Sequence, residues 1–171
     1  MVPYLGNFAL WVSLFIAALQ FLITFKKNSI LKKQISNITT NGMLMCALIS
    51  FFSLIYSYIV SDFTVNNVFQ NSHTSKPLIY KISATWGNHE GSMLLWILIL
   101  TIFNYFIFKL QNQKNSNLIF KALETQALII LGFVLFTLLT SNPFEKIDST
   151  QIDGLGFNPI LQDPALAIHP P

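Results

Sequence analysis

Four long apolar segments, separated by polar stretches, constrain what this chain can fold into. A helix of ~20 residues crosses the ~30 Å hydrocarbon core of a bilayer. Only 10% of the residues are charged, against ~25% in typical soluble domains, so the polar shell of a soluble protein is missing. We therefore predict an all-α, polytopic membrane protein that forms one membrane unit over residues 1–171, with transmembrane helices at 5–25, 43–60, 92–108 and 122–140.

The lysines are distributed unevenly over the polar stretches. The loops 26–42 and 109–121 hold four and three lysines and no acid, whereas 61–91 and 141–171 hold two and one. Loops rich in lysine remain on the cytoplasmic side of a membrane. We therefore expect the long loop 61–91, the tail 141–171 and the amino terminus at the outer face of an inner membrane, either bacterial or mitochondrial. Aromatic residues such as Phe63 favour ordered surface over a flexible linker there.

The sequence A-T-W-G-N-H-E-G-S, at residues 84–92, lies directly before the third apolar segment. Its two glycines allow a tight backbone path, and Asn88 or Ser92 can cap the helix that follows. Trp86 and Trp96 suit the headgroup depth of a membrane, where indole rings are favoured. An interfacial anchor with a helix cap therefore explains most of this cluster.

The anchor does not explain why an imidazole and a carboxylate are adjacent there. A helix amino terminus favours Glu90 as an anion, and Glu90 could then fix the tautomer or the charge of His89. His169, in D-P-A-L-A-I-H-P-P, is held out of the helical region by the proline that follows. A neutral histidine of this kind can ligate haem iron or zinc. His73 lies in a plain polar stretch, N-S-H-T-S.

Other chemistries have little support in the sequence. The histidines are far apart and the single cysteine, Cys46, has no partner, so zinc-binding and disulfide patterns are absent. Neither a glycine-rich phosphate loop nor a nucleophile elbow is present. The net charge of +3 is small and scattered, which argues against a nucleic-acid partner.

Five stretches, in the same order, resemble the CcmF family, a large integral-membrane protein of cytochrome c maturation. In the middle of the chain, the stretch that carries the resemblance is T-W-G-N-H-E-G-S-M-L-L-W at 85–96. The others are V-P-Y-L-G-N-F at 2–8, S-D-F-T-V at 61–65, L-F-T-L-L-T-S-N-P-F at 135–144 and G-F-N-P-I-L-Q-D-P-A-L-A-I-H-P-P at 156–171. The resemblance covers essentially the whole chain.

This resemblance implies a part of a haem lyase that attaches haem to apocytochrome c on the outer face of the membrane. The implied partners are apocytochrome c, the haem chaperone CcmE and CcmH-type subunits, and the implied cofactor is haem. By its place in P-A-L-A-I-H-P-P, His169 matches the first outer-face histidine of the family, which is thought to ligand the haem iron. Trp86, His89 and Glu90 are then expected to shape the surface that receives haem or a partner, without binding iron.

Two features of the family are missing from this chain. No W-G-G-x-W-x-W-D segment occurs, and no histidine falls within an apolar segment. We therefore expect the amino-terminal part of such a protein, either a fragment or one chain of a split gene, which would be inactive without the remainder.

Three alternatives remain open at this point. The first is the paralogue that serves a multihaem nitrite reductase. The second is a haem-export or solute permease, which should carry ionisable or helix-breaking residues at the bilayer midplane. Only Gln20, Asn104 and Gly132 are mild candidates for that role. The third is a scaffold that only docks the helices of a partner.

Overall fold

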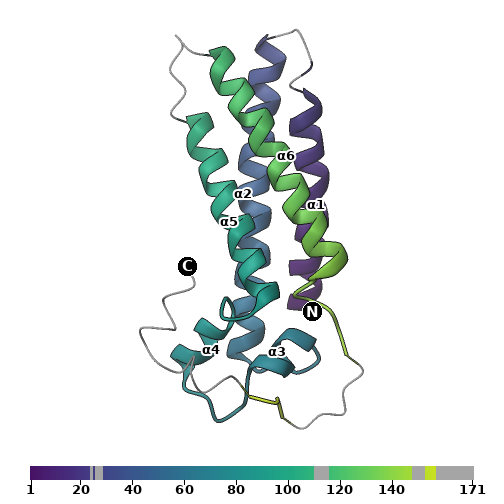
Figure 1. Ribbon diagram of the computed structural model, residues 1–171, viewed down its shortest axis with the longest axis vertical. Coiled ribbons are helices and arrows are strands. Elements are labelled where there is room, and N and C mark those ends of the chain that lie inside the picture. The colour runs from purple at the N-terminus through teal and green to yellow at the C-terminus, as the bar shows by residue number, and fades with distance from the viewer. Residues whose placement is uncertain (24, 26–28, 110–115, 148–152, 157–171) are drawn as a thin grey trace.

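The computed structural model describes residues 1–23, 25, 29–109, 116–147 and 153–156. Four helices in this part are long and apolar enough to cross a membrane. They are α1 (Val2–Ile23), α2 (Ser29–Ile59), α5 (His89–Lys109) and α6 (Ser116–Thr140), and they run side by side (Figure 1). Two short helices, α3 (Asn66–Asn71) and α4 (Leu78–Ala84), lie between α2 and α5 at one end of the molecule. The predicted all-α, multi-pass architecture is confirmed.

The long helices begin earlier than the apolar segments suggested. Helix α2 starts at Ser29. The apolar pattern of the sequence instead predicts a start at residue 43, with 26–42 as a loop. This stretch holds polar residues that end an apolar run but do not end a helix. Thr39 and Thr40 are buried, and Thr40 donates a hydrogen bond to Gln20 of α1. At 1.5 Å per residue, a helix of 31 residues is about 46 Å long, so α2 extends well beyond a ~30 Å core.

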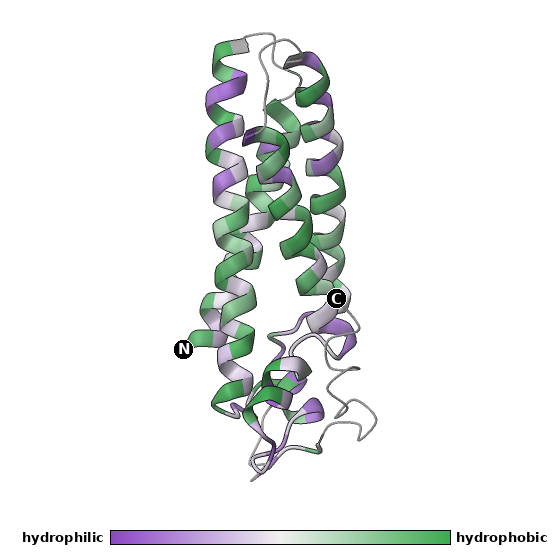
Figure 2. Ribbon diagram, turned by 90° about the vertical axis from the view of Figure 1, so that its left-hand side faces the viewer, coloured by the Kyte–Doolittle hydropathy of each residue, from purple (hydrophilic) through white to green (hydrophobic). Residues whose placement is uncertain are grey.

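The four long helices form a closed arrangement. Helix α1 packs against α2 and α6, and α5 packs against the same two helices. The centre is filled by buried apolar side chains, among them Leu10, Leu54, Leu94 and Ile130. Figure 2 shows that hydrophobic residues dominate the long helices, while polar residues gather toward the two ends. This distribution suits a bilayer, because polar groups in the hydrocarbon core cannot form hydrogen bonds with water.

A small polar network crosses the interior of the helix bundle. The side-chain amides of Gln20 and Asn104 bond each other over 3.1 and 3.4 Å, although both residues are fully buried. Thr40 donates to the Gln20 carbonyl oxygen, and Gln20 donates to the backbone carbonyl of Leu123, each over 3.4 Å. The network therefore connects all four long helices. Because polar groups within a bilayer need internal partners, these amides have a structural role and give no support to a permease.

The end of the molecule that carries α3 and α4 is called here the capped end. The segment after α6 crosses it and pairs with the segment after α2: Asn66 N donates to Glu145 O over 2.9 Å, and Ile147 N donates to Thr64 O over 3.1 Å. The aromatic side chains of Phe63 and Phe144 belong to the main core. The predicted outer loop is thus folded surface.

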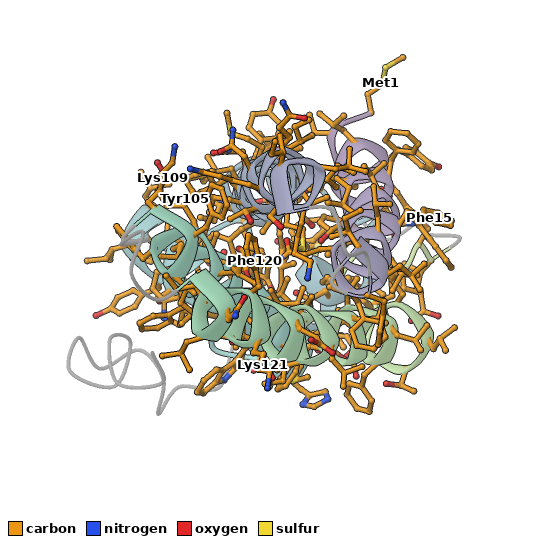
Figure 3. The ribbon with its side chains drawn as sticks, turned by 90° about the horizontal axis from the view of Figure 1, so that it is seen from above. Met1, Phe15, Tyr105, Lys109, Phe120 and Lys121 are labelled. Carbon is orange, nitrogen blue, oxygen red and sulfur yellow. The ribbon has the colours of Figure 1, made fainter. Side chains whose placement is uncertain are left out.

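The amino terminus of α1 also lies at the capped end (Figure 1). The opposite end carries lysines, including Lys109 and Lys121 (Figure 3), and the ammonium groups of Lys32 and Lys109 lie over the rings of Phe120 and Tyr105. The lysine-rich end and the capped end therefore lie at opposite ends of the helix bundle, as the predicted grouping of the loops requires. The compartment that each end faces remains a prediction.

Candidate functional site

The turn between α4 and α5 is built by two residues of the W-G-N-H-E-G sequence. The Asn88 side-chain oxygen accepts a hydrogen bond from Gly91 N over 2.8 Å, so Asn88 caps α5 as predicted. A Cβ atom on Gly91 would lie 1.6 Å from the carbonyl oxygen of Thr85. No residue with a side chain fits there without moving the backbone, so this glycine is needed for the close approach of the two helices.

A polar cluster joins this turn to α2 and α3. The Tyr58 hydroxyl, fully buried at the end of α2, lies 2.6 Å from the Asn67 side-chain oxygen and accepts from Asn88 Nδ2 over 3.0 Å. Asn67 Nδ2 in turn donates to Asn88 Oδ1 and to Glu90 Oε2, over 2.8 and 3.1 Å. Each of these polar groups has a partner, which makes the cluster a rigid support for the start of α5.

His89 and Glu90 lie in the first turn of α5, not before it. Their side chains bind different partners: His89 Nε2 lies 3.1 Å from the Ser141 hydroxyl, and Glu90 accepts from Asn67. The expectation that Glu90 would fix the tautomer of His89 is therefore wrong, since Ser141 contacts the imidazole. His89 is exposed, Glu90 is half-buried, and Trp86 is half-buried and packs against the main core.

A small polar cleft of about 40 Å³ opens beside Glu90. It has room for one or two water molecules. Its walls come from α3, the first turn of α5, the end of α6 and the segment that follows α6. The residues that line it are Asn66, Asn67, Gln70, Glu90, Thr140, Ser141, Asn142 and Glu145. The cleft thus gathers two carboxylates and several amides from segments that are distant in the sequence.

Residues 153–156, called here the strap, lie against α3 and the segment that follows it. Leu155 N donates to Phe69 O over 2.8 Å, and Gly156 N donates to Ser72 O over 3.1 Å. The Asp153 carboxylate accepts from the Thr74 hydroxyl and lies 3.2 Å from His73 Nε2. These contacts fasten the strap to the capped end.

The strap should loosen in acid. Hydrogen bonds from the hydroxyl and backbone N–H of Thr74 and from Gly154 N hold the pKa of Asp153 below its ordinary range. A carboxyl group whose folded pKa is lowered stabilises the folded state above its ordinary pKa, and this contribution is lost as the pH falls through the lowered pKa. We expect Asp153→Asn to reduce the hydrogen-exchange protection of the Leu155 amide at neutral pH. The reduction should match the one that acid causes in the unmodified chain.

Asp62→Asn is the matched control, because Asp62 accepts from the backbone and side chain of Thr64 and does not contact the strap. Equal protection of Leu155 in all three proteins at neutral pH would contradict the role of Asp153.

Sequence patterns did not indicate several residues that surround the turn between α4 and α5. Tyr58, Asn67 and Ser141 each contact the turn between α4 and α5 from 21 to 52 positions away. Their residue types alone gave no signal. In the described ranges no group of three His, Cys, Asp or Glu side chains could hold a metal ion. The exposed imidazoles there are single groups that already contact Asp153 or Ser141, and His169 lies outside the described residues.

Comparison with known proteins identifies the family. The model of the cytochrome C assembly protein family matches residues 86–171, half of the chain, and so begins at Trp86. Over its whole length the chain is 42% identical to the cytochrome c-type biogenesis protein CycK of Rhizobium meliloti (strain 1021), and 35% identical to CcmF of Haemophilus influenzae. It spans 26% and 27% of the length of these two relatives.

A solved structure of the cytochrome c haem lyase CcmF has the same fold. The match covers 85% of this chain and 25% of that one, with a TM-score of 0.79 and 21% sequence identity. The chain therefore belongs to the cytochrome C assembly protein family and corresponds to the amino-terminal part of its CcmF members.

Proposed function

We propose that this chain acts in cytochrome c maturation, as the amino-terminal section of a membrane haem lyase that attaches haem to apocytochrome c. One observation carries the proposal most directly: the family match begins at Trp86 and includes the first turn of α5, where the cluster at the capped end is built. The curated relatives are named as cytochrome c-type biogenesis proteins. The capped end then faces the periplasm or the intermembrane space, and the protein resides in the inner membrane.

The residues of the cluster divide into two roles in this proposal. Trp86 packs against the core and Glu90 is fixed by Asn67, so both shape the surface. His89 is the most exposed of the three, so it is the one that a haem group or a partner could reach most readily. Haem iron itself would be ligated by His169, whose neutral imidazole has the right chemistry. The partners would be apocytochrome c, the haem chaperone CcmE, CcmH-type subunits and the rest of the family's polypeptide.

Deleting the gene in its own organism tests the proposal. We expect the loss of covalently bound haem from all c-type cytochromes, measured by haem-peroxidase staining of denaturing gels, and its recovery on complementation. Loss confined to a multihaem nitrite reductase would instead support the paralogue. Normal staining of every c-type cytochrome would reject both roles and favour a permease or a scaffold.

Replacement of His89 tests the surface role of the imidazole. We expect His89→Ala, in the complete assembly, to lower holocytochrome c by about tenfold, which corresponds to about 1.4 kcal/mol in the limiting step. Haem-peroxidase staining would measure the yield. The loss of one hydrogen bond costs only about 1 kcal/mol of stability, so the protein should still accumulate in the membrane.

Ser141→Ala is the matched control, because it removes the same hydrogen bond and keeps the imidazole. It should leave the yield unchanged. A normal yield from His89→Ala would reduce the cluster to a structural anchor, and an equal loss from Ser141→Ala would mean that the bond, not the imidazole, matters.

A further inference from the structure

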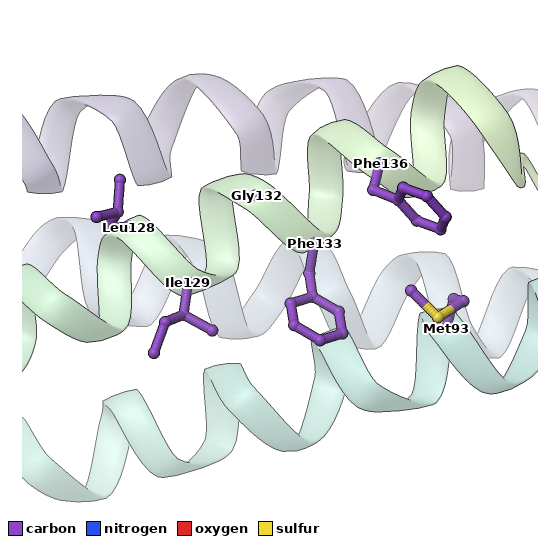
Figure 4. A pocket seen from close by; sticks show the side chains of 6 residues that line it. All are labelled: Met93, Leu128, Ile129, Gly132, Phe133 and Phe136. Carbon is purple, nitrogen blue, oxygen red and sulfur yellow. The ribbon is translucent and has the colours of Figure 1, made fainter.

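An apolar groove runs along the junction of α5 and α6. Its volume is about 480 Å³. Figure 4 shows Phe133 and Ile129 of α6 reaching toward α5, with the Met93 side chain of α5 at one end. The six lining residues are Met93, Leu128, Ile129, Gly132, Phe133 and Phe136, so no charged or hydrogen-bonding side chain lines it. The groove lies between two membrane-spanning helices, so its opening faces the apolar interior of the membrane or another apolar surface.

Gly132 sets this groove apart from ordinary gaps between side chains. A glycine within a helix costs about 1 kcal/mol of helix stability relative to alanine, and in this chain other glycines have a visible reason. A Cβ atom on Gly6, Gly91 or Gly154 would lie 2.4, 1.6 or 2.1 Å from a neighbouring atom. A Cβ atom on Gly132 would meet nothing within 4 Å. Nothing among the described residues of the chain uses the missing side chain.

We infer that the groove is the seat of another transmembrane helix, which belongs to the polypeptide that supplies the rest of the family's length. Glycines at helix interfaces in membranes let a second backbone approach closely, which would give Gly132 a role that no described residue of this chain gives it. Helix α6 is also the least covered of the four: 33% of its apolar window is buried, against 39%, 44% and 39% in α1, α2 and α5.

The size of the relatives supports this occupant. The chain accounts for 26% of the length of CycK and 25% of the solved CcmF chain. About three quarters of such a protein therefore lies outside the part that this chain represents, and we infer that this remainder supplies the additional helix. A lipid chain adapts to any apolar surface, so it would give the glycine no role. A haem group would leave its carboxylates without a partner in a groove that has no polar side chain.

Photo-crosslinking in native membranes tests the inference. A benzoylphenylalanine would be placed at Leu128 in the complete assembly of the source organism, and the cross-linked peptide would be identified by mass spectrometry. We expect a peptide from a long apolar segment of a cytochrome c assembly family polypeptide, outside the counterpart of residues 1–171. Cross-links to lipid alone, to a second copy of this chain, or to no protein would overturn the inference.

A second variant shows whether the groove itself is responsible. Gly132→Leu fills the groove and should lower the yield of that cross-link by about tenfold, since packed contacts tolerate added volume poorly. Leu19→Trp adds bulk at an exposed position of α1 and should leave the yield unchanged. An unchanged yield in Gly132→Leu, or an equal loss in both variants, would also overturn it. The readout is a cross-link, so the result is independent of whether the assembly attaches haem.

Discussion

Replacing Gly91 by alanine is expected to lower the free energy of unfolding of the capped end by about 3 kcal/mol, because overpacking at a site that cannot relax costs about this much. The new methyl group would lie 1.6 Å from the backbone oxygen of Thr85. Helix propensity acts in the opposite direction, by about 1 kcal/mol in favour of alanine. The steric term is larger, and it involves backbone on both sides, so α4 and α5 would have to separate.

Separation of these two helices would also break the Asn88 cap and the hydrogen bonds of Asn67. Hydrogen exchange of the purified chain in micelles would measure the effect as lost protection over residues 62–91. Gly132→Ala is the control: the same substitution in α6, with nothing within 4 Å of the new atom, should leave the capped end unchanged. Wild-type protection in Gly91→Ala would show that the close approach to Thr85 is not structurally important.

The membrane architecture could be predicted because it depends on a property that is local in the sequence. An apolar run of sufficient length must be helical within a bilayer, whatever surrounds it, and all four runs are helices. The start of α2 could not be predicted in the same way. Residues 29–42 are polar enough to end a hydropathy signal, yet they contain no proline that would end a helix. Their helical state depends on tertiary structure, in which Thr39 and Thr40 are buried and Thr40 bonds Gln20 of α1.

In the candidate site, too, local features could be predicted from the sequence and long-range contacts could not. The Asn88 cap and the tight turn at Gly91 could be predicted, since both follow from residues within one turn of each other. The partners of Glu90 and His89 could not, because Asn67 and Ser141 reach them only after α3 and the end of α6 have packed beside α5. The adjacency of His89 and Glu90 in the sequence was misleading, since consecutive residues of a helix do not face each other.

The strongest functional test falls on His169, whose role as an axial ligand of haem is a proposal drawn from the family resemblance. We expect His169→Ala, in the complete assembly, to lower the transfer of haem to apocytochrome c at least about a hundredfold, since even the outer-shell partners of metal ligands are worth 10- to 100-fold. Haem-peroxidase staining would measure the transfer. The visible absorption spectrum of the purified assembly should also lose the signature of an imidazole-ligated iron.

The spectrum separates ligation from a general loss of structure. His169→Met keeps a side chain that can bind haem iron, so it should restore a ligand-bound spectrum of a different kind. His73→Ala is the matched control: it removes an imidazole that contacts Asp153 of the strap and Ser75, and it should leave both the spectrum and the transfer unchanged. If His169→Ala retained the wild-type spectrum and transferred haem normally, the imidazole at 169 would not be an iron ligand. The proposed contribution of this chain to haem handling would then rest on His89 and the surface of the capped end.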